Sequence, residues 1–177
     1  MKVKMETEAE AGAEVKAEAS KSVHTVAFVT SDGDNIQLLE HQDFIGPAHF
    51  GSPDRGSVPV GWSFSPAMAA LMPTVLDYVR DGLSANDSLS AGPSGAGYAY
   101  PQLYASNASD DSIDMREKFA EATAALMAAA GQTVVNVIGV TPSAESVAPL
   151  MAQPQVKGLI YFTFSVADMG YAALNGN

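Results

Sequence analysis

The stretch "TVVNVIGVTPSAESVAPLMAQPQVKGLIYFTFS", residues 133–165, contains a complete strand–helix–strand unit. Residues 133–140 and 156–165 are rich in β-branched and aromatic residues, which is typical of buried strands. Residues 143–152, between them, have the length and apolar content of a short helix. Strands that are joined through a helix pair in parallel, because the crossover brings the chain back to the same end of the sheet. The stretch therefore predicts a parallel sheet with crossover helices.

The same alternation extends towards the N-terminus. The further predicted strands are residues 23–30, 58–64 and 87–92, and the further predicted helices are residues 35–44, 66–83 and 114–131. Pro73 predicts a kink or a break within the second of these helices. Five strands that alternate with helices predict an α/β fold, either an incomplete TIM-like barrel, since eight strands are needed for closure, or an open doubly wound sheet.

Composition divides the chain into a tail and a body. Residues 1–21 repeat Glu, Ala and Lys without a large apolar face, which predicts a frayed helix or a disordered tail, and residues 22–177 form the α/β domain. The chain has 20 acidic and 9 basic residues; the tail holds 5 Glu and 4 Lys, which leaves 15 acids against 5 scattered bases in the body. Neither nucleic acid nor an anionic membrane surface is therefore an expected partner.

Metal and cofactor chemistry has little support in the sequence. The 177 residues include no cysteine, which excludes disulfides and thiolate sites, and the three histidines lack the spacing of zinc ligands. We expect no metal and no cofactor. The sequence has neither an apolar run long enough to span a membrane nor the apolar segment of a secretory signal, so the compartment stays open.

The unusual residues follow the predicted strands, at the edge where parallel α/β folds bind ligands. The loop "GPSGAGYAYP", residues 92–101, follows the third strand. Gly95 and Gly97 are expected to permit positive φ or a close backbone approach. Tyr98 and Tyr100 alternate about one residue, so in extended backbone they point the same way. They form either a binding platform or a cover for the end of the sheet.

Three aspartates are the candidate catalytic and binding carboxylates. Asp32 and Asp34 follow the first strand in "SDGDN", and Asp168 follows the last strand. We expect Asp32 to act as an acid or base with Asp34 in support, while an Asx turn or a helix N-cap is the structural alternative.

Tryptophan and serine side chains add candidate contacts on the same edge. Trp62 is expected either to stack on a ligand at the end of the second strand or to pack in the core. Ser94 is a candidate donor to ligand hydroxyls. A serine nucleophile is disfavoured, because the sequence contains no Gly-x-Ser-x-Gly elbow.

The string "GAGYAYP", residues 95–101, reproduces the signature of the GxGYxYP putative glycoside hydrolases. The segments "FVTSDGDNIQ", "GWSFSPAMAALMP" and "VVNVIG" also resemble that family, in a consistent order over residues 23–171. The resemblance implies sugar chemistry at the strand ends. Members of the family are much longer and typically exported, so the resemblance implies that this chain is a fragment and that its full-length relatives are exported.

Carbohydrate is the expected partner, with three possible activities. Glycoside hydrolysis needs two carboxyl groups about 5 Å apart for retention, or about 6.5–9.5 Å apart for inversion. A non-catalytic carbohydrate-binding module would use only Trp62, Tyr98 and Tyr100. A magnesium-dependent phosphoryl transfer on the "DGD" loop is the third possibility, with Asp32 as the nucleophile.

Overall fold

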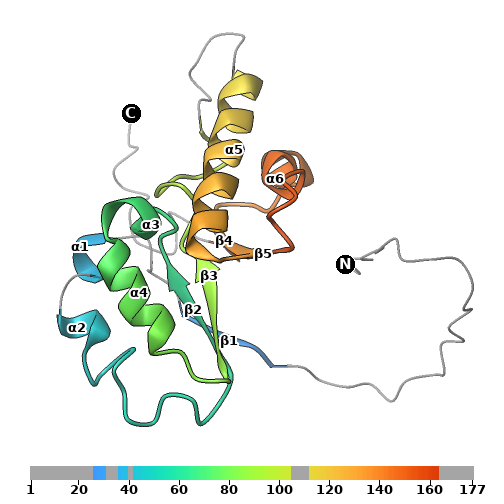
Figure 1. Ribbon diagram of the computed structural model, residues 1–177. Helices are drawn as coiled ribbons and strands as arrows, with labels where there is room; N and C mark the ends of the chain where they lie inside the picture. The colour runs from blue at the N-terminus through green and yellow to red at the C-terminus, as the bar shows by residue number, and fades with distance from the viewer. Residues whose placement is uncertain (1–25, 31–35, 40–41, 105–111, 164–177) are drawn as a thin grey trace, which may run out of the picture.

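The computed structural model describes residues 26–30, 36–39, 42–104 and 112–163. These residues form a layer of five parallel strands and a layer of helices packed against it (Figure 1). The predicted tail, residues 1–21, lies outside the described residues.

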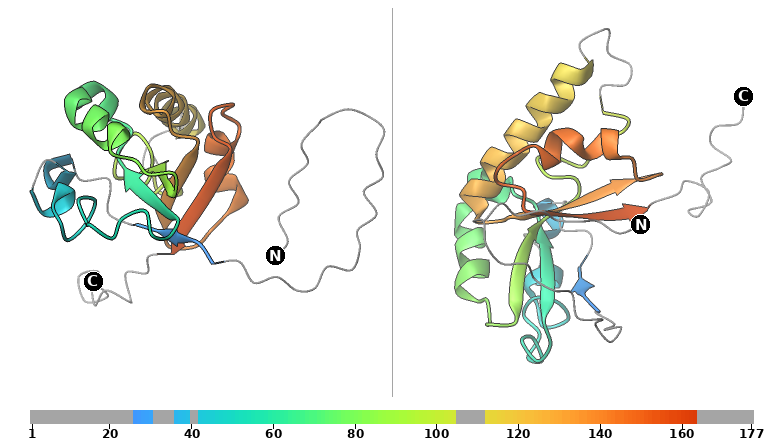
Figure 2. Two further views of the ribbon diagram at one scale, coloured as in Figure 1. Left: turned by 60° about the horizontal axis from the view of Figure 1, so that its bottom comes forward. Right: turned by 90° about the vertical axis from the view of Figure 1, so that its right-hand side faces the viewer.

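The sheet has the strand order of a barrel. Its strands are β1 (Phe28–Val29), β2 (Val60–Phe64), β3 (Asp87–Ala91), β4 (Val134–Gly139) and β5 (Gly158–Thr163). All four neighbouring pairs are parallel, and the spatial order β1-β2-β3-β4-β5 is also the chain order. A doubly wound sheet reverses its order at a switch point, and the described strands have no such reversal. The sheet curls into a half-barrel (Figure 2), so the predicted incomplete barrel is confirmed and the doubly wound alternative is wrong.

The helices follow the predicted pattern. They are α1 (Ile36–Leu39), α2 (Gln42–Ile45), α3 (Met68–Leu71), α4 (Pro73–Asp81), α5 (Ser112–Ala130) and α6 (Ala144–Met151). Pro73 breaks the predicted helix into α3 and α4 and takes the first position of α4, where its missing N–H is not needed. Gly131 directly follows α5 and has φ of +69°, a conformation that ends a helix.

Alternate strand residues face opposite sides of the sheet. Trp62, Phe64, Val135 and Val137 point towards the helices and belong to the hydrophobic core. The residues between them point to the inner, concave side. The register partners Val29, Gly61 and Ser88 share one side of the sheet, because a Cβ at Gly61 would lie 3.5 Å from Val29 Cγ2 and 3.6 Å from Ser88 Oγ.

The core consists of two hydrophobic clusters on the helix side of the sheet. The first contains Leu39, Phe50, Trp62, Phe64, Met68, Met72, Leu76, Val79 and Ala130. The second contains Ala91, Ala120, Met127, Val135, Val137, Leu150 and Val156. The first cluster covers β2, and the second covers β4 and the end of β3.

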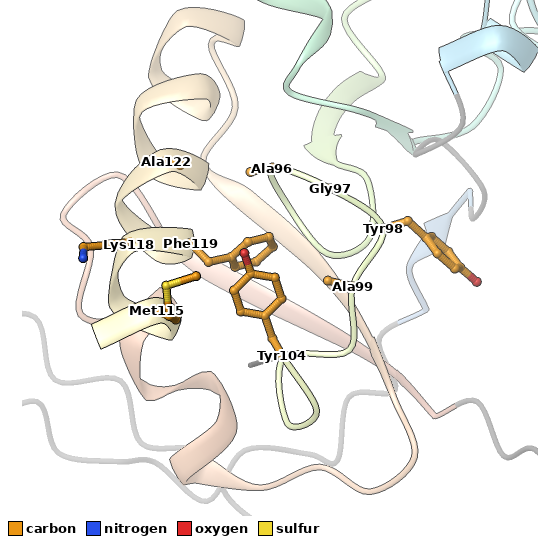
Figure 3. A pocket seen from close by; sticks show the side chains of 9 residues that line it. All are labelled: Ala96, Gly97, Tyr98, Ala99, Tyr104, Met115, Lys118, Phe119 and Ala122. Carbon is orange, nitrogen blue, oxygen red and sulfur yellow. The ribbon is translucent and has the colours of Figure 1, made fainter. Parts of the chain in front are cut away.

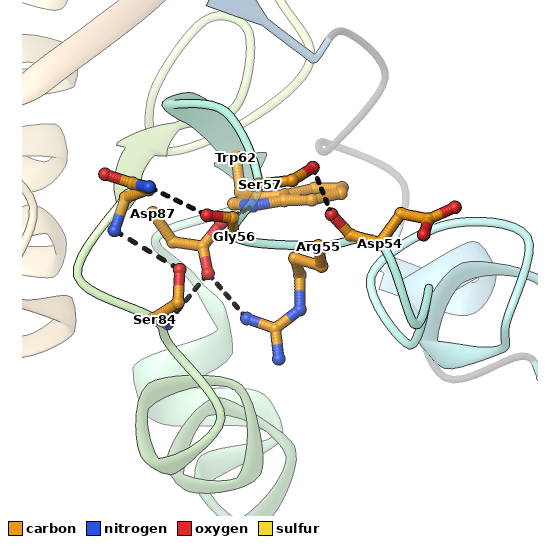
Figure 4. A network of polar contacts seen from close by, with 8 residues as sticks. Asp54, Arg55, Gly56, Ser57, Trp62, Ser84 and Asp87 are labelled. Atoms are coloured by element: carbon orange, nitrogen blue, oxygen red, sulfur yellow. Dashed lines mark hydrogen bonds and ion pairs between the residues drawn. The ribbon is translucent and has the colours of Figure 1, made fainter.

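A buried carboxylate fixes the amino end of the sheet (Figure 4). Asp87, the first residue of β3, accepts hydrogen bonds from Trp62 Nε1 at 2.8 Å, Arg55 Nη1 at 2.6 Å and Ser84 N at 2.8 Å. Arg55 also lies 4.2 Å from the Phe50 ring centroid. Burial alone would raise the pKa of Asp87, but the hydrogen bonds from Trp62, Ser84 and Arg55 outweigh it and hold the pKa below its ordinary value. The amino end of a parallel barrel serves stability, so we assign this network to the fold.

Side-chain hydrogen bonds supplement a sparse backbone ladder at the junction between β3 and β4. Ala91 and Val135 are the one residue pair in register between these strands. Gln132, just before β4, is fully buried, and its Nε2 donates to Phe64 O and to Ser90 O, both at 2.9 Å. Its amide therefore links β2, β3 and β4 where the backbone ladder is sparse.

Candidate functional site

The loop after β3, residues 92–101, is held by hydrogen bonds between its own backbone groups and by one to the end of β2. Gly92 N donates to Phe64 O at 2.8 Å, Gly95 N donates to Gly92 O at 2.7 Å, and Ser94 N donates to Gly97 O at 3.0 Å. These bonds fix the loop at the carboxyl end of β3. We call it the signature loop below.

Gly95 is required by both conformation and space. It has φ of +89°, and a Cβ here would lie 2.4 Å from Thr123 Cγ2 and 2.7 Å from Thr123 Oγ1 on α5. Ala96 N donates to the same Oγ1 at 3.0 Å. The expected reason for a glycine is thus confirmed at Gly95. It is wrong for Gly97, where a Cβ would meet nothing within 4 Å and φ is not positive.

Ser94 ties the signature loop to β4. Its side chain is fully buried, and its Oγ accepts a hydrogen bond from Ile138 N at 3.0 Å. This contact, together with Thr123, anchors the loop on both a strand and a helix. Ser94 therefore holds the loop in shape, and its contact with a ligand hydroxyl stays a prediction.

The two signature tyrosines are exposed to different degrees. Tyr98 is 59% exposed, and in Figure 3 its ring points away from α5, whereas Ala99 lies on the opposite side of the loop. Tyr100 is half-buried, and its carbonyl accepts from Leu103 N and Tyr104 N. The platform formed by both rings stays a prediction.

Trp62 lies in the middle of β2 and faces the helices. It is 8% exposed, packs edge-on against Phe50 with ring centroids 5.3 Å apart, and donates its N–H to Asp87. This is the core arrangement, one of the two that the sequence left open. The side chain has a structural reason to be there that involves no ligand.

The candidate carboxylates Asp32, Asp34 and Asp168 lie outside the described residues. Thr30 leads into residues 31–35, which carry Asp32 and Asp34 and are called the aspartate loop below. Thr30 N donates to Gly61 O at 2.8 Å, and Thr30 Oγ1 accepts from Ser63 N at 2.8 Å. The loop after β1 therefore starts beside β2 at the carboxyl edge of the sheet.

A buried polar cluster on the concave side was not predicted from the sequence. Asn136 Nδ2 donates to Ser63 Oγ and Ser90 Oγ, both at 3.0 Å, and Ser90 Oγ donates to Trp62 O at 3.3 Å. Asn136 is fully buried, and its Oδ1 has no hydrogen-bond partner. The sequence did contain a signal for this cluster. Each of three successive strands has one polar residue between apolar neighbours, at a position where the alternation of side chains along a strand directs it to the concave side.

A second missed group joins three segments at the carboxyl edge. Tyr161 Oη lies 3.1 Å from Gln102 Oε1 and 3.0 Å from Thr141 O. Gly139 makes room for it, because a Cβ there would lie 1.9 Å from the hydroxyl. Burial raises the pKa of Tyr161, and the hydrogen bond with Gln102 opposes this shift. No local pattern predicts this contact, because its partners are far apart in sequence.

Other kinds of site find no support in the described residues. They contain no group of three or more histidine or acidic side chains placed to hold a metal ion. None of the helices among them has the length and hydrophobicity to cross a membrane.

Comparison with known proteins gives two matches. Residues 22–173 match the family described as "GxGYxYP putative glycoside hydrolase C-terminal domain". A solved structure, that of a putative hydrolase from Bacteroides thetaiotaomicron VPI-5482, has a similar fold, with a TM-score of 0.65 and 23% sequence identity. The match covers 82% of this chain and 28% of that one, so the chain spans less than a third of that protein. No match is found among curated proteins.

Proposed function

Since the chain belongs to the GxGYxYP putative glycoside hydrolase C-terminal domain family, we propose that it acts on carbohydrate at the carboxyl ends of its strands. The reaction is hydrolysis of a glycosidic bond. Asp32 is the general acid or base, and Asp34 is the second carboxyl group. Tyr98 and Tyr100 contact the sugar, and Asp168 is a further carboxylate for its hydroxyls.

The position of the signature loop relative to the aspartate loop carries this proposal. Their parent strands, β3 and β1, lie on either side of β2 in a parallel sheet. Neighbouring strands are about 4.8 Å apart, so the two loops begin about 10 Å apart on the same edge. This distance suits one ligand that touches both loops.

The rigidity of the signature loop supports the same proposal. Thr123 and Ile138 hold the loop from a helix and a strand, so the exposed Tyr98 ring is presented from a fixed backbone. A preformed aromatic surface binds a sugar without the entropy loss of ordering a loop.

The experiment measures cleavage and binding of a panel of neutral and acidic oligosaccharides by the chain and by Asp32→Asn, Asp34→Asn and Tyr98→Ala. We expect Asp32→Asn to lose turnover by about 10²–10⁴-fold while it keeps affinity, because it removes proton transfer alone. Tyr98→Ala should mainly raise KM. Asp54→Asn, the same change at an exposed aspartate remote from the carboxyl ends of the strands, is the matched control.

Each of the other possible results of this experiment leads to a different conclusion about the function. Full turnover by both aspartate variants overturns the catalytic assignment. Binding without cleavage by the unmodified chain identifies a carbohydrate-binding module. Cleavage of a phosphomonoester that depends on magnesium, with every sugar ignored, identifies phosphoryl transfer on the aspartate loop.

A further inference from the structure

A pocket of about 420 Å³ lies between the signature loop and α5, on the side of the loop opposite the Tyr98 ring (Figure 3). Its lining residues come from the loop, the turn after it and the first half of α5. This volume falls in the range of about 300–1,000 Å³ that is usual for small-molecule sites.

Two aromatic rings provide the apolar surface of the pocket. Tyr104 follows the signature loop and Phe119 lies on α5; their ring centroids are 4.8 Å apart, with the planes tilted by 40°. Both side chains are half-buried, so part of each ring stays accessible. Rings of this kind pack well against the C–H face of a pyranose, since both surfaces are flat and apolar.

Small residues form the facing wall, and two of them have backbone N–H groups without an acceptor in the described part of the chain. Ala96, Gly97 and Ala99 line it, and the space beside Gly97 is empty to at least 4 Å from the position of a Cβ. In the described part of the chain, neither Gly97 N nor Ala99 N donates a hydrogen bond to any acceptor. Two such N–H groups beside an apolar floor suit a ligand with hydroxyls around a flat ring.

Contacts with α5 hold the loop side of the pocket in place. Gly95 packs directly on Thr123 of α5, and Ala96 N donates to the Thr123 hydroxyl, so the wall is fixed to the helix that carries the floor. A preformed pocket avoids the free-energy cost of ordering its walls on binding.

Charge favours a neutral ligand. Among the described lining residues, Lys118 is the one ionisable side chain besides tyrosine, and Figure 3 shows its ammonium directed away from the Tyr104 and Phe119 rings. Among the lining residues that the structure describes there is no carboxylate, so this site differs from the aspartate loop.

We propose that this pocket binds a neutral pyranose residue of an oligosaccharide whose other end lies at the strand-end site. The sugar ring stacks on Tyr104 and Phe119, and its hydroxyls accept from Gly97 N and Ala99 N. The pocket is thus a distal subsite that selects longer glycans. This inference rests on the proposed function, since it takes carbohydrate as the ligand of this face.

The test fills the pocket without disturbing the core. Ala122 and Ala125 are both exposed alanines of α5, and only Ala122 lines the pocket. Isothermal titration with the disaccharides and hexasaccharides of β-1,4-glucan, β-1,4-xylan, β-1,4-mannan and α-1,4-glucan compares Ala122→Leu with Ala125→Leu. We expect Ala122→Leu to weaken binding of the preferred hexasaccharide at least tenfold and to leave the disaccharide unchanged. Ala125→Leu should match the unmodified chain.

A second variant tests the aromatic surface of the pocket. Phe119→Leu keeps an apolar side chain but removes the ring, so it should cause a similar loss if its melting temperature shows that it folds. Equal hexasaccharide affinity in Ala122→Leu and Ala125→Leu overturns the subsite while the strand-end function stands. No affinity for any of these sugars overturns the neutral-sugar subsite, and if acidic glycans are also ignored, the proposed function falls with it. Binding of the dye anilinonaphthalene sulfonate that Ala122→Leu removes, with sugars ignored, identifies a site for aromatic molecules and also overturns it.

Discussion

Replacement of Gly95 by alanine tests whether the signature loop is locked onto α5. The new Cβ would lie 2.4 Å from Thr123 Cγ2 and 2.7 Å from Thr123 Oγ1, so one of the two segments has to move. The alanine would also have to adopt φ of +89°, a backbone conformation that residues other than glycine rarely adopt. The two penalties have separate causes and are separable by mutation.

The expected loss of stability is the sum of these penalties. A positive φ costs about 1–2 kcal/mol for a residue with a Cβ. Overpacking against a fully buried neighbour costs about 1–3 kcal/mol. Gly95→Ala should therefore lower the free energy of unfolding by about 2–5 kcal/mol, a large part of the roughly 5–15 kcal/mol of a typical domain. For a domain of this size, the melting temperature should fall by roughly 4–20 °C.

Urea denaturation followed by circular dichroism measures this loss in a double-mutant cycle. Thr123→Ala removes the two nearest atoms and keeps only the Cβ, 3.1 Å from the new methyl group, so in that background Gly95→Ala should cost mainly the conformational term of about 1–2 kcal/mol. Gly97→Ala is the control and should change stability by less than about 0.5 kcal/mol, since its surroundings are open. If Gly95→Ala is as stable as Gly97→Ala, the loop is not fixed through this contact.

Three further changes test the buried polar groups. Asp87→Asn should cost about 3 kcal/mol, the low end for a broken buried pair because Arg55 is 18% exposed. It should also flatten the acid limb of the stability curve, since the lowered pKa of Asp87 gives stability that is lost as pH falls below about 4. Trp62→Phe should cost about 2 kcal/mol through the lost hydrogen bond to Asp87 and leave sugar affinity unchanged. Tyr161→Phe should cost about 1 kcal/mol at pH 8 through the lost contact with Gln102. The cost should shrink as pH rises above 10, because the raised pKa of Tyr161 makes its ionisation oppose folding there.

Urea midpoints at pH 3, 5, 8 and 10.5 check these expectations, with titration of an oligosaccharide for Trp62→Phe. An Asp87→Asn variant with the same acid limb as the unmodified chain would contradict the assigned role of the carboxylate. Loss of sugar affinity in a stable Trp62→Phe variant would return the indole to the binding surface. A Tyr161→Phe cost that stays constant between pH 8 and 10.5 would contradict the pKa argument.

The fold could be predicted from the sequence because its signals are local. Apolar strand segments and helical periods recur at the spacing of βα units, and Pro73 and Gly131 mark their breaks within a few residues. The choice between a half-barrel and a doubly wound sheet was not local, since it depends on the side to which each new strand is added. That side follows from packing between distant segments, such as Ala130 at the end of α5 and Phe64 of β2 in the first hydrophobic cluster.

The site was predictable only where backbone conformation forces a residue type. Gly95 satisfies that condition, and Gly97 does not, although both look alike in the sequence. The Asn136 cluster and the Tyr161 contact were missed because their partners lie 46–73 and 20–59 residues away in the chain. Pairing at such separation follows from sheet register, which a single sequence does not specify.

The single register pair at the junction of β3 and β4 has a consequence for cooperativity. The boundary between the two hydrophobic clusters lies close by, within β3, since Leu89 packs against the first cluster whereas Ala91 belongs to the second. Gln132 and Asn136 bridge that boundary through side-chain amides rather than main-chain bonds. Partial opening of the molecule should therefore begin along this line, and backbone amides beside it should exchange with deuterium sooner than those within β4 and β5.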